Sequence, residues 1–419
     1  MSPGDQSSSD PSSGDKPLRP VRSQRPWPPE LEVTAHLVEP LATSANSQPH
    51  AESLTLSSVW SMPSLDAADA ALGDPTDGSF AYRRDAHPNA RSLAFKLATL
   101  HGAERCVLTA QGMSALAAVA WSCLKPGSEV WLAGDLYGKT RSMFMHGLGP
   151  WQIFSRTFNP TSAEDLKRLA GGRADLVIIE TISNPRLLVS DIAELARITH
   201  GTGGKLLVDN TFASHLIARP LALGADLCME SLTKIVSGHS DSMLGMVCGR
   251  DAALMQRIAE AVSLYGLTSS PLDCYLTTRG LASLPLRLEA ACTNALALAE
   301  LLSSHRFVER VDYPGLPAHP QHALAQRQLT AYGWMVCIEL SGGRDAVART
   351  IQRLAPEIPF CPSLGDIQTT VSHPASTSHR ALPADELAQR GISGGTLRIS
   401  VGAEPTAWLC DKFARALNG

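Results

Sequence analysis

The chain has 419 residues, a formal net charge of −4 and a pI near 6.4. This length exceeds what one simple hydrophobic core organises, so we expect two packed domains. The mild acidity argues against nucleic acid as the main partner. No apolar run approaches the roughly 20 residues that cross a bilayer, and the first residues show neither the basic nor the apolar segment of a secretory signal. We therefore expect a cytoplasmic protein with no membrane partner.

Residues 1–75 are predicted to form an N-terminal arm that is partly disordered. Ser, Pro, Gly and Asp dominate its first two thirds, and hardly any periodic apolar pattern appears there.

From Arg91 onward, short apolar runs alternate with helical patterns. The runs are "RCVLTAQG", "SEVWLAGD", "WQIFSRTF", "ADLVIIET", "KLLVDNTF" and "ADLCMES", and helical segments such as "SAEDLKRLA" and "DIAELARITH" separate many of them. This order predicts an α/β fold over residues 76–284, with a mainly parallel sheet flanked by helices. Ligands of such sheets bind beyond the carboxyl ends of the strands, so we expect Glu180, Asp209 and Ser231 at one rim.

A Leu/Ala-rich helical stretch follows Asp273 and runs to about Ser303, with an interruption expected near Pro285. A second, shorter α/β pattern comes next, in "FVERVDYPG", "GWMVCIELSGG" and "GTLRISVGAE". We expect a smaller C-terminal domain over residues 285–419.

The stretch "SLTKIVSGHSD" places Lys234 in a turn rich in hydroxyl groups and glycine. A lysine after a strand is usually a solvated surface residue. Here, however, Ser231 and Thr233 offer hydroxyl groups that suit a phosphate, and Gly238 continues a tight turn. An amine that acts as a nucleophile needs such a confined setting.

Three further residues extend this pattern. Asp209 ends an apolar run and either caps a turn or holds the nitrogen of a pyridine ring protonated. Gly112 opens an Ala-rich helix, and the N–H groups at a helix start bind phosphate well. Arg398 lies in an apolar strand and needs an anionic partner, either an internal carboxylate or that of a substrate. The combination indicates a pyridoxal 5'-phosphate (PLP) enzyme that acts on amino acids.

The chain resembles the Cys/Met-metabolism family of PLP enzymes, from about Phe80 to its C-terminus. The resemblance rests on "YRRDAHPN", "QGMSA", "GDLYGKT", "ETISNP", "VDNTFAS", "PLALGAD", "ESLTKIVSGHSD", "TTRGLASLPLR", "YPGL", "SLGD", "HPASTSH" and "LRISVGAE". It implies the aspartate-aminotransferase-like fold, called fold type I. It also implies PLP as the cofactor and a homotetramer built from active dimers.

The resemblance also implies roles for individual residues. Lys234 matches the lysine that binds PLP covalently, Asp209 the partner of the ring nitrogen, and Tyr137 the tyrosine that stacks on the ring and moves a proton. The other positions that match cofactor-binding residues are Gly112, Met113, Thr211, Ser231, Thr233, Tyr82 and Arg84. The last two match a pair that reaches the phosphate of a neighbouring subunit. Asn184, Ser363 and Arg398 match positions around the substrate carboxylate and a cofactor oxygen.

The implied reaction forms or cleaves C–S bonds of sulfur amino acids by β or γ elimination or by γ replacement, as in cystathionine gamma-synthases and cystathionine lyases. Several residues depart from the family pattern, namely His87, Asn89, Gln111, Lys139 and Pro362. Proline stands at position 362 where many cystathionine enzymes carry glutamate, and Lys139 stands where methionine gamma-lyases carry cysteine. "YGKTR" is similar to plant-type cystathionine gamma-synthases, whereas "HPASTSH" is similar to the sulfhydrylases. Methionine gamma-lyase and O-acylhomoserine sulfhydrylase activities therefore stay open, as does the question of synthesis or cleavage.

Other functions have weaker support. A dehydrogenase lacks its GxGxxG motif and a serine hydrolase its GxSxG motif. The nine cysteines are scattered with no Cys-x-x-Cys pair, which favours reduced thiols and no metal site. A metal site of His319, His322, His373 and His379 is a minor alternative, as are an aminotransferase and a non-catalytic family member.

Overall fold

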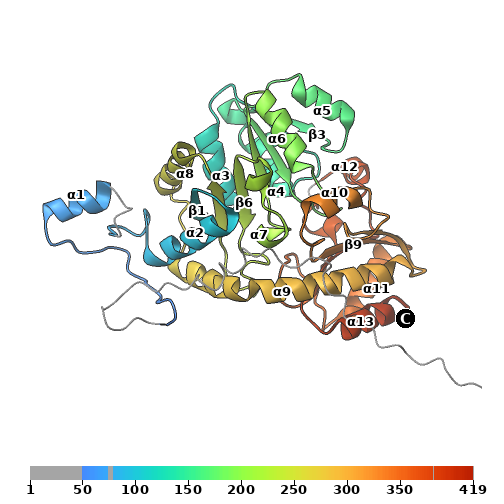
Figure 1. The fold of residues 1–419 in the computed structure, drawn as a ribbon. Helices are drawn as coiled ribbons and strands as arrows, with labels where there is room; N and C mark the ends of the chain where they lie inside the picture. The colour runs from blue at the N-terminus through green and yellow to red at the C-terminus, as the bar shows by residue number, and fades with distance from the viewer. Residues whose placement is uncertain (1–49, 74–78, 381, 419) are drawn as a thin grey trace, which may run out of the picture.

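The computed structural model describes residues 50–73, 79–380 and 382–418 (Figure 1). Most of the predicted N-terminal arm, residues 1–49, lies outside the described residues. The described part of the arm carries the short helix α1 (Leu65–Gly73), and an isolated β-bridge joins Val59 to Tyr82.

A seven-stranded sheet forms the larger part of the molecule. Its strands lie in the order β1-β7-β6-β5-β4-β2-β3. The four pairs from β6 to β3 are parallel, whereas β7 runs antiparallel to both of its neighbours. The strands are β1 (Arg105–Thr109), β2 (Glu129–Ala133), β3 (Phe154–Phe158), β4 (Leu176–Glu180), β5 (Lys205–Asp209), β6 (Leu227–Ser231) and β7 (Gly245–Gly249).

Helices cover both faces of this sheet. Strand β4 reads "LVIIE" and is buried along its whole length, as a parallel strand between two helical layers must be. Helix α3 packs with α8 and lies against β6 and β7. The helices of this part are α2 (Pro88–His101), α3 (Gly112–Cys123), α4 (Gly138–Ser142), α5 (Ala163–Ala170), α6 (Ile192–Gly201), α7 (Ser214–Ile217) and α8 (Ala252–Leu264).

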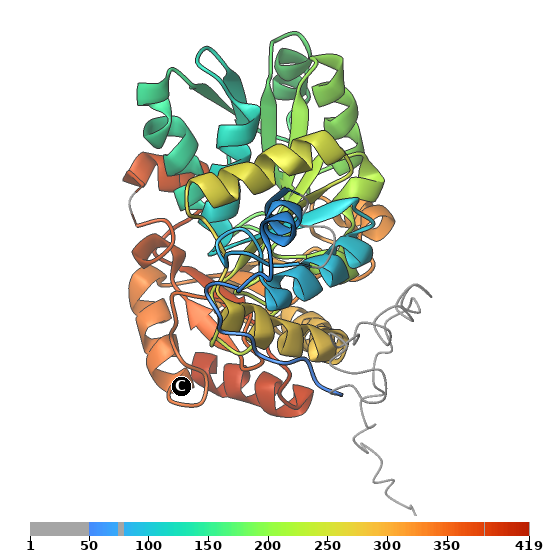
Figure 2. The same cartoon turned by 90° about the vertical axis from the view of Figure 1, so that its left-hand side faces the viewer.

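A smaller sheet of four antiparallel strands has its own hydrophobic core and the order β10-β11-β9-β8. In Figures 1 and 2 these orange and red elements lie beside the blue-to-green part that holds the larger sheet. The strands are β8 (Val308–Asp312), β9 (Met335–Leu340), β10 (Thr370–Ser372) and β11 (Thr396–Ser400). The helices are α10 (His322–Gln328), α11 (Gly343–Leu354), α12 (Ala384–Gln389) and α13 (Thr406–Asn418).

The 33-residue helix α9 (Pro271–Ser303) connects the two parts and packs against α2 at one end and α13 and β8 at the other. The expected interruption near Pro285 is wrong, because the helix continues through that residue. An interior proline costs about 3 kcal/mol, but Leu281, Leu284 and Leu288 are buried on either side of it and hold both halves in place. Within the described residues, no helix combines the length and apolarity needed to cross a membrane.

Candidate active site

A cavity of about 300 Å³ lies where β4, β5 and β6 end. Glu180, Asp209 and Ser231 are the last residues of these strands, and all three line it, at the rim where parallel strands place a ligand crevice. The smaller sheet and its loops contribute the opposite wall. The predicted residues that the structure brings together here are Gly112, Met113, Tyr137, Asn184, Asp209, Thr211, Ser231, Thr233, Lys234, Ser363 and Arg398.

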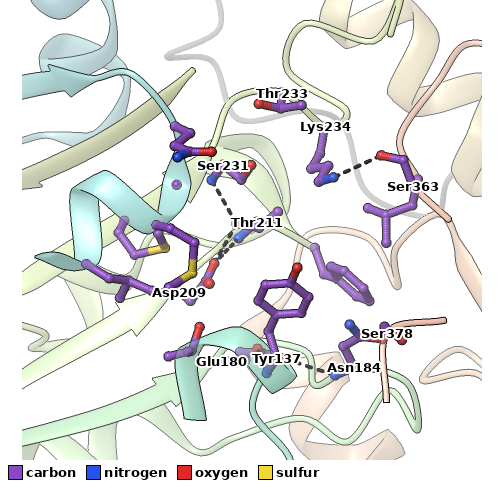
Figure 3. A pocket seen from close by; sticks show the side chains of 18 of the residues that line it. Tyr137, Glu180, Asn184, Asp209, Thr211, Ser231, Thr233, Lys234, Ser363 and Ser378 are labelled. Atoms are coloured by element: carbon purple, nitrogen blue, oxygen red, sulfur yellow. Dashed lines mark hydrogen bonds between the residues drawn. The ribbon is translucent and has the colours of Figure 1, made fainter. Parts of the chain in front are cut away.

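Lys234 enters the cavity from the turn that follows β6, and its Nζ donates a hydrogen bond of 2.9 Å to Ser363 Oγ (Figure 3). Burial lowers the pKa of Lys234, and the positive charge of Arg398 lowers it further. A lysine with a lowered pKa presents a larger share of neutral amine, which is the nucleophilic form.

The turn behind Lys234 is held by Arg287, a buried residue of α9 for which the sequence predicts no role. Its guanidinium donates to the carbonyl oxygens of Ile235 at 2.8 Å and Val236 at 3.0 Å. Gly238 is required beside it, because its φ is +74° and a Cβ there would lie 1.9 Å from Arg287 Nη1. The motif "TTRGLASLPLR" contains Arg287, but only the fold shows what this side chain contacts.

Asp209 faces the same cavity and is connected to Ser231 through Thr211 (Figure 3). Its Oδ1 accepts a hydrogen bond of 2.5 Å from Thr211 Oγ1 and one of 3.0 Å from Thr211 N–H. Thr211 Oγ1 in turn accepts from Ser231 N–H at 2.9 Å. Burial raises the pKa of Asp209 to about 6, and the two hydrogen bonds from Thr211 oppose that rise.

The start of α3 fits a phosphate group. The side chain of Gln111 does not cap this helix, so its first N–H groups are open to a ligand. A Cβ on Gly112 would lie 3.1 Å from Ser231 Cβ, so glycine keeps this corner open. The Thr233 hydroxyl exchanges hydrogen bonds with the backbone of Leu244, which fixes its position at the cavity wall.

Glu180, which the sequence predicts at this rim but without a specific contact, organises the wall that carries Tyr137 and Asn184. Its carboxylate accepts the Tyr137 N–H at 2.7 Å and the Asn184 N–H at 3.0 Å. Burial and the charge of Asp209 raise the pKa of Glu180. The Tyr137 ring stands above this wall with its hydroxyl directed into the cavity (Figure 3).

Arg398 lies in β11 with 2% of its surface exposed. Its Nη1 donates to Asn184 Oδ1 at 2.7 Å, and no carboxylate of the described residues lies within the 4.0 Å of an ion pair. Burial lowers the pKa of Arg398 to about 10, so the side chain keeps its charge near neutral pH. The internal salt bridge that the sequence left open is therefore not formed. A buried cation without a carboxylate fits an anionic ligand in the cavity.

Tyr82 and Arg84 do not line this cavity. They lie at the surface, where the Arg84 guanidinium is 5.1 Å from the centre of the Tyr82 ring. Of the residues that depart from the family pattern, Gln111 and Pro362 line the cavity, whereas His87, Asn89 and Lys139 do not. His87 caps α2 by accepting the Ala90 N–H, so its role there is structural.

Comparisons with known proteins identify the family of the chain. The family model described as "Cys/Met metabolism PLP-dependent enzyme" matches residues 35–418. The chain is 34% identical to an L-methionine gamma-lyase of Pseudomonas deceptionensis over 87% of this chain and 91% of that protein. It is 36% identical to an O-succinylhomoserine sulfhydrylase of Pseudomonas aeruginosa over 88% of this chain and 91% of that protein.

Among solved structures, cystathionine gamma synthase from Xanthomonas oryzae pv. oryzae superposes with a TM-score of 0.84. The match has 35% identity and covers 89% of this chain and 94% of that one. These matches confirm the predicted fold type I architecture and the predicted cofactor. The chain belongs to the Cys/Met metabolism family of PLP-dependent enzymes.

Proposed function

We propose that this PLP-dependent enzyme forms or cleaves C–S bonds of sulfur amino acids, with Lys234, Tyr137 and Asp209 as its catalytic residues. One observation carries the proposal. The buried guanidinium of Arg398, which has no carboxylate partner among the described residues, shares a cavity with a lysine of lowered pKa and with an aspartate on the opposite side. This arrangement receives an amino acid by its carboxylate and presents its α-carbon to the amine.

Each residue has a distinct task in this proposal. PLP, when bound, supplies an electron sink for a negative charge that develops at the α-carbon. Lys234 attaches the cofactor and moves the α-proton, while Asp209 accepts a hydrogen bond from the ring nitrogen and keeps it protonated. The Tyr137 hydroxyl donates a proton to the departing sulfur.

The remaining cavity residues hold the two partners in position. The N–H groups of Gly112 and Met113, with Ser231, Thr211 and Thr233 beside them, surround the phosphate and the ring. Asn184 and Ser363 orient the substrate carboxylate together with Arg398. Asn184 is hydrogen-bonded to Arg398, and Ser363 lines the same cavity beside Lys234.

Two alternatives within the family are a methionine gamma-lyase and an O-acylhomoserine sulfhydrylase, and relatives of both kinds are similar to the chain. Pro362 lines the cavity and offers no charge to a distal amine, which favours substrates whose far end is apolar or an ester. An aminotransferase or a non-catalytic member of the family has less support. All predicted cofactor-binding residues line the cavity, apart from the two that are expected to reach a neighbouring subunit.

We further propose a cytoplasmic homotetramer in which neighbouring subunits complete each other's sites. Tyr82 and Arg84 lie outside the cavity of their own chain, and 47% of the Tyr82 surface is exposed. Their aromatic and cationic side chains are suited to a phosphate presented by a partner subunit. The predicted division into residues 76–284 and 285–419 also stays a proposal, since its boundary falls inside the continuous helix α9.

The test is an absorbance titration of the purified chain loaded with PLP. L-Methionine, L-cystathionine and O-succinyl-L-homoserine with L-cysteine are added in turn, and thiol, keto acid and ammonia are measured. We expect one substrate to shift the visible band and release product, and Lys234→Ala to lose both responses. Lys139→Ala is the matched control, because Lys139 does not line the cavity. Unchanged absorbance and turnover in Lys234→Ala would contradict the proposal.

A further inference from the structure

A second group of reactive side chains lies behind the cavity, on the other face of the larger sheet. Cys228 of β6 is paired directly with Cys248 of β7 across the antiparallel ladder. Side chains alternate along a strand, so Cys228 points away from the cavity that Met229 and Ser231 line. His101, in the last turn of α2, packs onto the two cysteines.

The three residues have the spacing of metal ligands. His101 Nδ1, Cys228 Sγ and Cys248 Sγ all lie within 4.8 Å of one another, and His101 Nδ1 is 3.8 Å from Cys228 Sγ. Zinc bonds of ~2.3 Å to sulfur and ~2.0 Å to nitrogen place neighbouring ligands roughly 3.5–4.0 Å apart. Small rotations of the side chains therefore suffice to close the group around one ion. Among the described residues, no other set of three His, Cys, Asp or Glu side chains has this spacing.

Glu230 supplies the outer contact that metal-binding histidines usually have. Its Oε1 lies 3.5 Å from His101 Nε2, the ring nitrogen that faces away from the cysteines. A carboxylate at this place fixes the orientation of the ring and directs the other nitrogen at a metal. His101 Nε2 and Glu230 Oε2 have no hydrogen-bond partner as the chain stands, although both side chains are at least 99% buried.

Burying so many polar groups without full pairing is costly unless a ligand compensates for it. Two thiolates and one neutral imidazole balance the charge of a divalent cation in a closed interior. Cys228 and Cys248 are fully buried, and His101 has 1% of its surface exposed. The same enclosure keeps oxidants away from the thiols, which favours a structural ion acquired during folding, with one enclosed water completing the four ligands of zinc.

We propose that His101, Cys228 and Cys248 bind one zinc ion, with Glu230 hydrogen-bonded to the outer nitrogen of His101. Binding forms two S–Zn bonds and one N–Zn bond and releases two protons from the three side chains to solvent. The ligands come from positions 101, 228 and 248, so no Cys-x-x-Cys motif marks the site in the sequence. For that reason the sequence predicted no metal. The four histidines weighed as a metal site do not form such a group in the described chain.

The test measures zinc in the full chain, expressed without a polyhistidine tag and purified under reducing conditions. The chain is unfolded, stripped with a chelator, and refolded with PLP and one equivalent of Zn²⁺. After gel filtration we expect close to one zinc per chain. With Co²⁺ in place of Zn²⁺ we expect the ultraviolet thiolate-to-metal absorbance of a site with two sulfur ligands.

Cys228→Ser and Cys248→Ser should each lower the zinc content at least tenfold. Cys337→Ser is the matched control, since Cys337 is also fully buried but lies in the smaller sheet. A refolded wild-type chain without zinc, or a double Cys228→Ser, Cys248→Ser chain that retains it, would overturn the proposal. Neither readout depends on turnover, so failure here is distinguishable from failure of the proposed enzyme activity.

Discussion

Thr211 should set the pH at which the chain accepts its cofactor. Its hydroxyl donates to Asp209 Oδ1 and accepts from Ser231 N–H, so Thr211→Val removes both hydrogen bonds while it nearly conserves volume. The backbone N–H of residue 211 still donates to Asp209. The ionised form of Asp209 therefore loses one of its two hydrogen bonds, and the Ser231 N–H loses its acceptor.

The size of the effect follows from the hydrogen bond that is lost. A hydrogen bond to a charged group contributes about 1.5–3 kcal/mol, which corresponds to roughly one to two pKa units at 1.36 kcal/mol per unit. Burial already raises the pKa of Asp209 to about 6. In Thr211→Val we expect the pKa to rise to roughly 7–8.

The direction of the pH dependence follows from the charge that the ring nitrogen needs. Ionised Asp209 pairs with a protonated ring nitrogen, whereas protonated Asp209 does not. The affinity of the wild-type chain for PLP should therefore fall below pH 6, approaching tenfold per pH unit. In the cofactor-free chain the raised pKa of Asp209 has the opposite sign, because it lowers the free energy of unfolding as the pH rises from about 4 to about 6.

The assay is PLP binding by equilibrium dialysis between pH 5 and 9, for wild type, Thr211→Val and Thr211→Ser. Serine keeps the hydroxyl, so Thr211→Ser should retain the wild-type midpoint. The valine variant should lose affinity at a pH at least one unit higher. Identical midpoints for valine and wild type would refute the role assigned to this hydroxyl.

Three other substitutions test the phosphate-binding helix start, the carboxylate-binding arginine and the residues proposed to reach a neighbouring subunit. Gly112→Ala brings a Cβ to 3.1 Å from the Cβ of the facing Ser231. In equilibrium dialysis it should weaken PLP binding about tenfold, or ~1.4 kcal/mol. Gly149→Ala is the control and should bind PLP like the wild type, because its Cβ meets nothing within 4 Å. Arg398→Lys keeps the positive charge but loses the bidentate contact with the substrate carboxylate. Steady-state kinetics should therefore show kcat/KM reduced about 10–100-fold, mainly through a higher KM. Mixed oligomers of Tyr82→Phe and Lys234→Ala should regain activity that neither has alone, and absence of rescue would contradict shared sites.

The sequence predicts the strands of the larger sheet whose burial requires an apolar composition. Strands β1, β2, β4, β5 and β6 are short, mainly apolar runs, because a strand covered on both sides needs apolar residues along most of its length. The edge strand β3, "FSRTF", is mostly exposed or half-buried and was found from its two phenylalanines and its place in the alternating pattern. Strand β7 was missed. Its sequence "GMVCG" has glycine at both ends, and its antiparallel pairing with β1 and β6 depends on segments far away in the chain. Pro285 caused the opposite error. Its local chemistry predicts a break in helix α9, but tertiary packing keeps the helix continuous.

The candidate site divides in a similar way. Residues that act through their own side chain at the end of a strand or in a motif could be named, and the fold brings Lys234, Asp209 and Arg398 into one cavity. Glu180 and Arg287 received no role, because both act on backbone groups of other segments: Glu180 holds two loops and Arg287 holds the turn after Lys234. Such contacts join residues up to 52 positions apart, which no local pattern encodes.

Strand β6 carries both proposed sites, one on each face. Ser231 faces the cofactor cavity, whereas Glu230 faces the proposed zinc ligands and accepts a hydrogen bond of 2.9 Å from Asn210 Nδ2. Asn210 follows Asp209 directly and also accepts the Thr181 hydroxyl at 2.7 Å. The backbone that positions Asp209 is therefore held from behind by buried, charged and hydrogen-bonded groups. A metal ion that fixes His101 would strengthen that support, because His101 Nε2, which now has no hydrogen-bond partner, would then donate to Glu230.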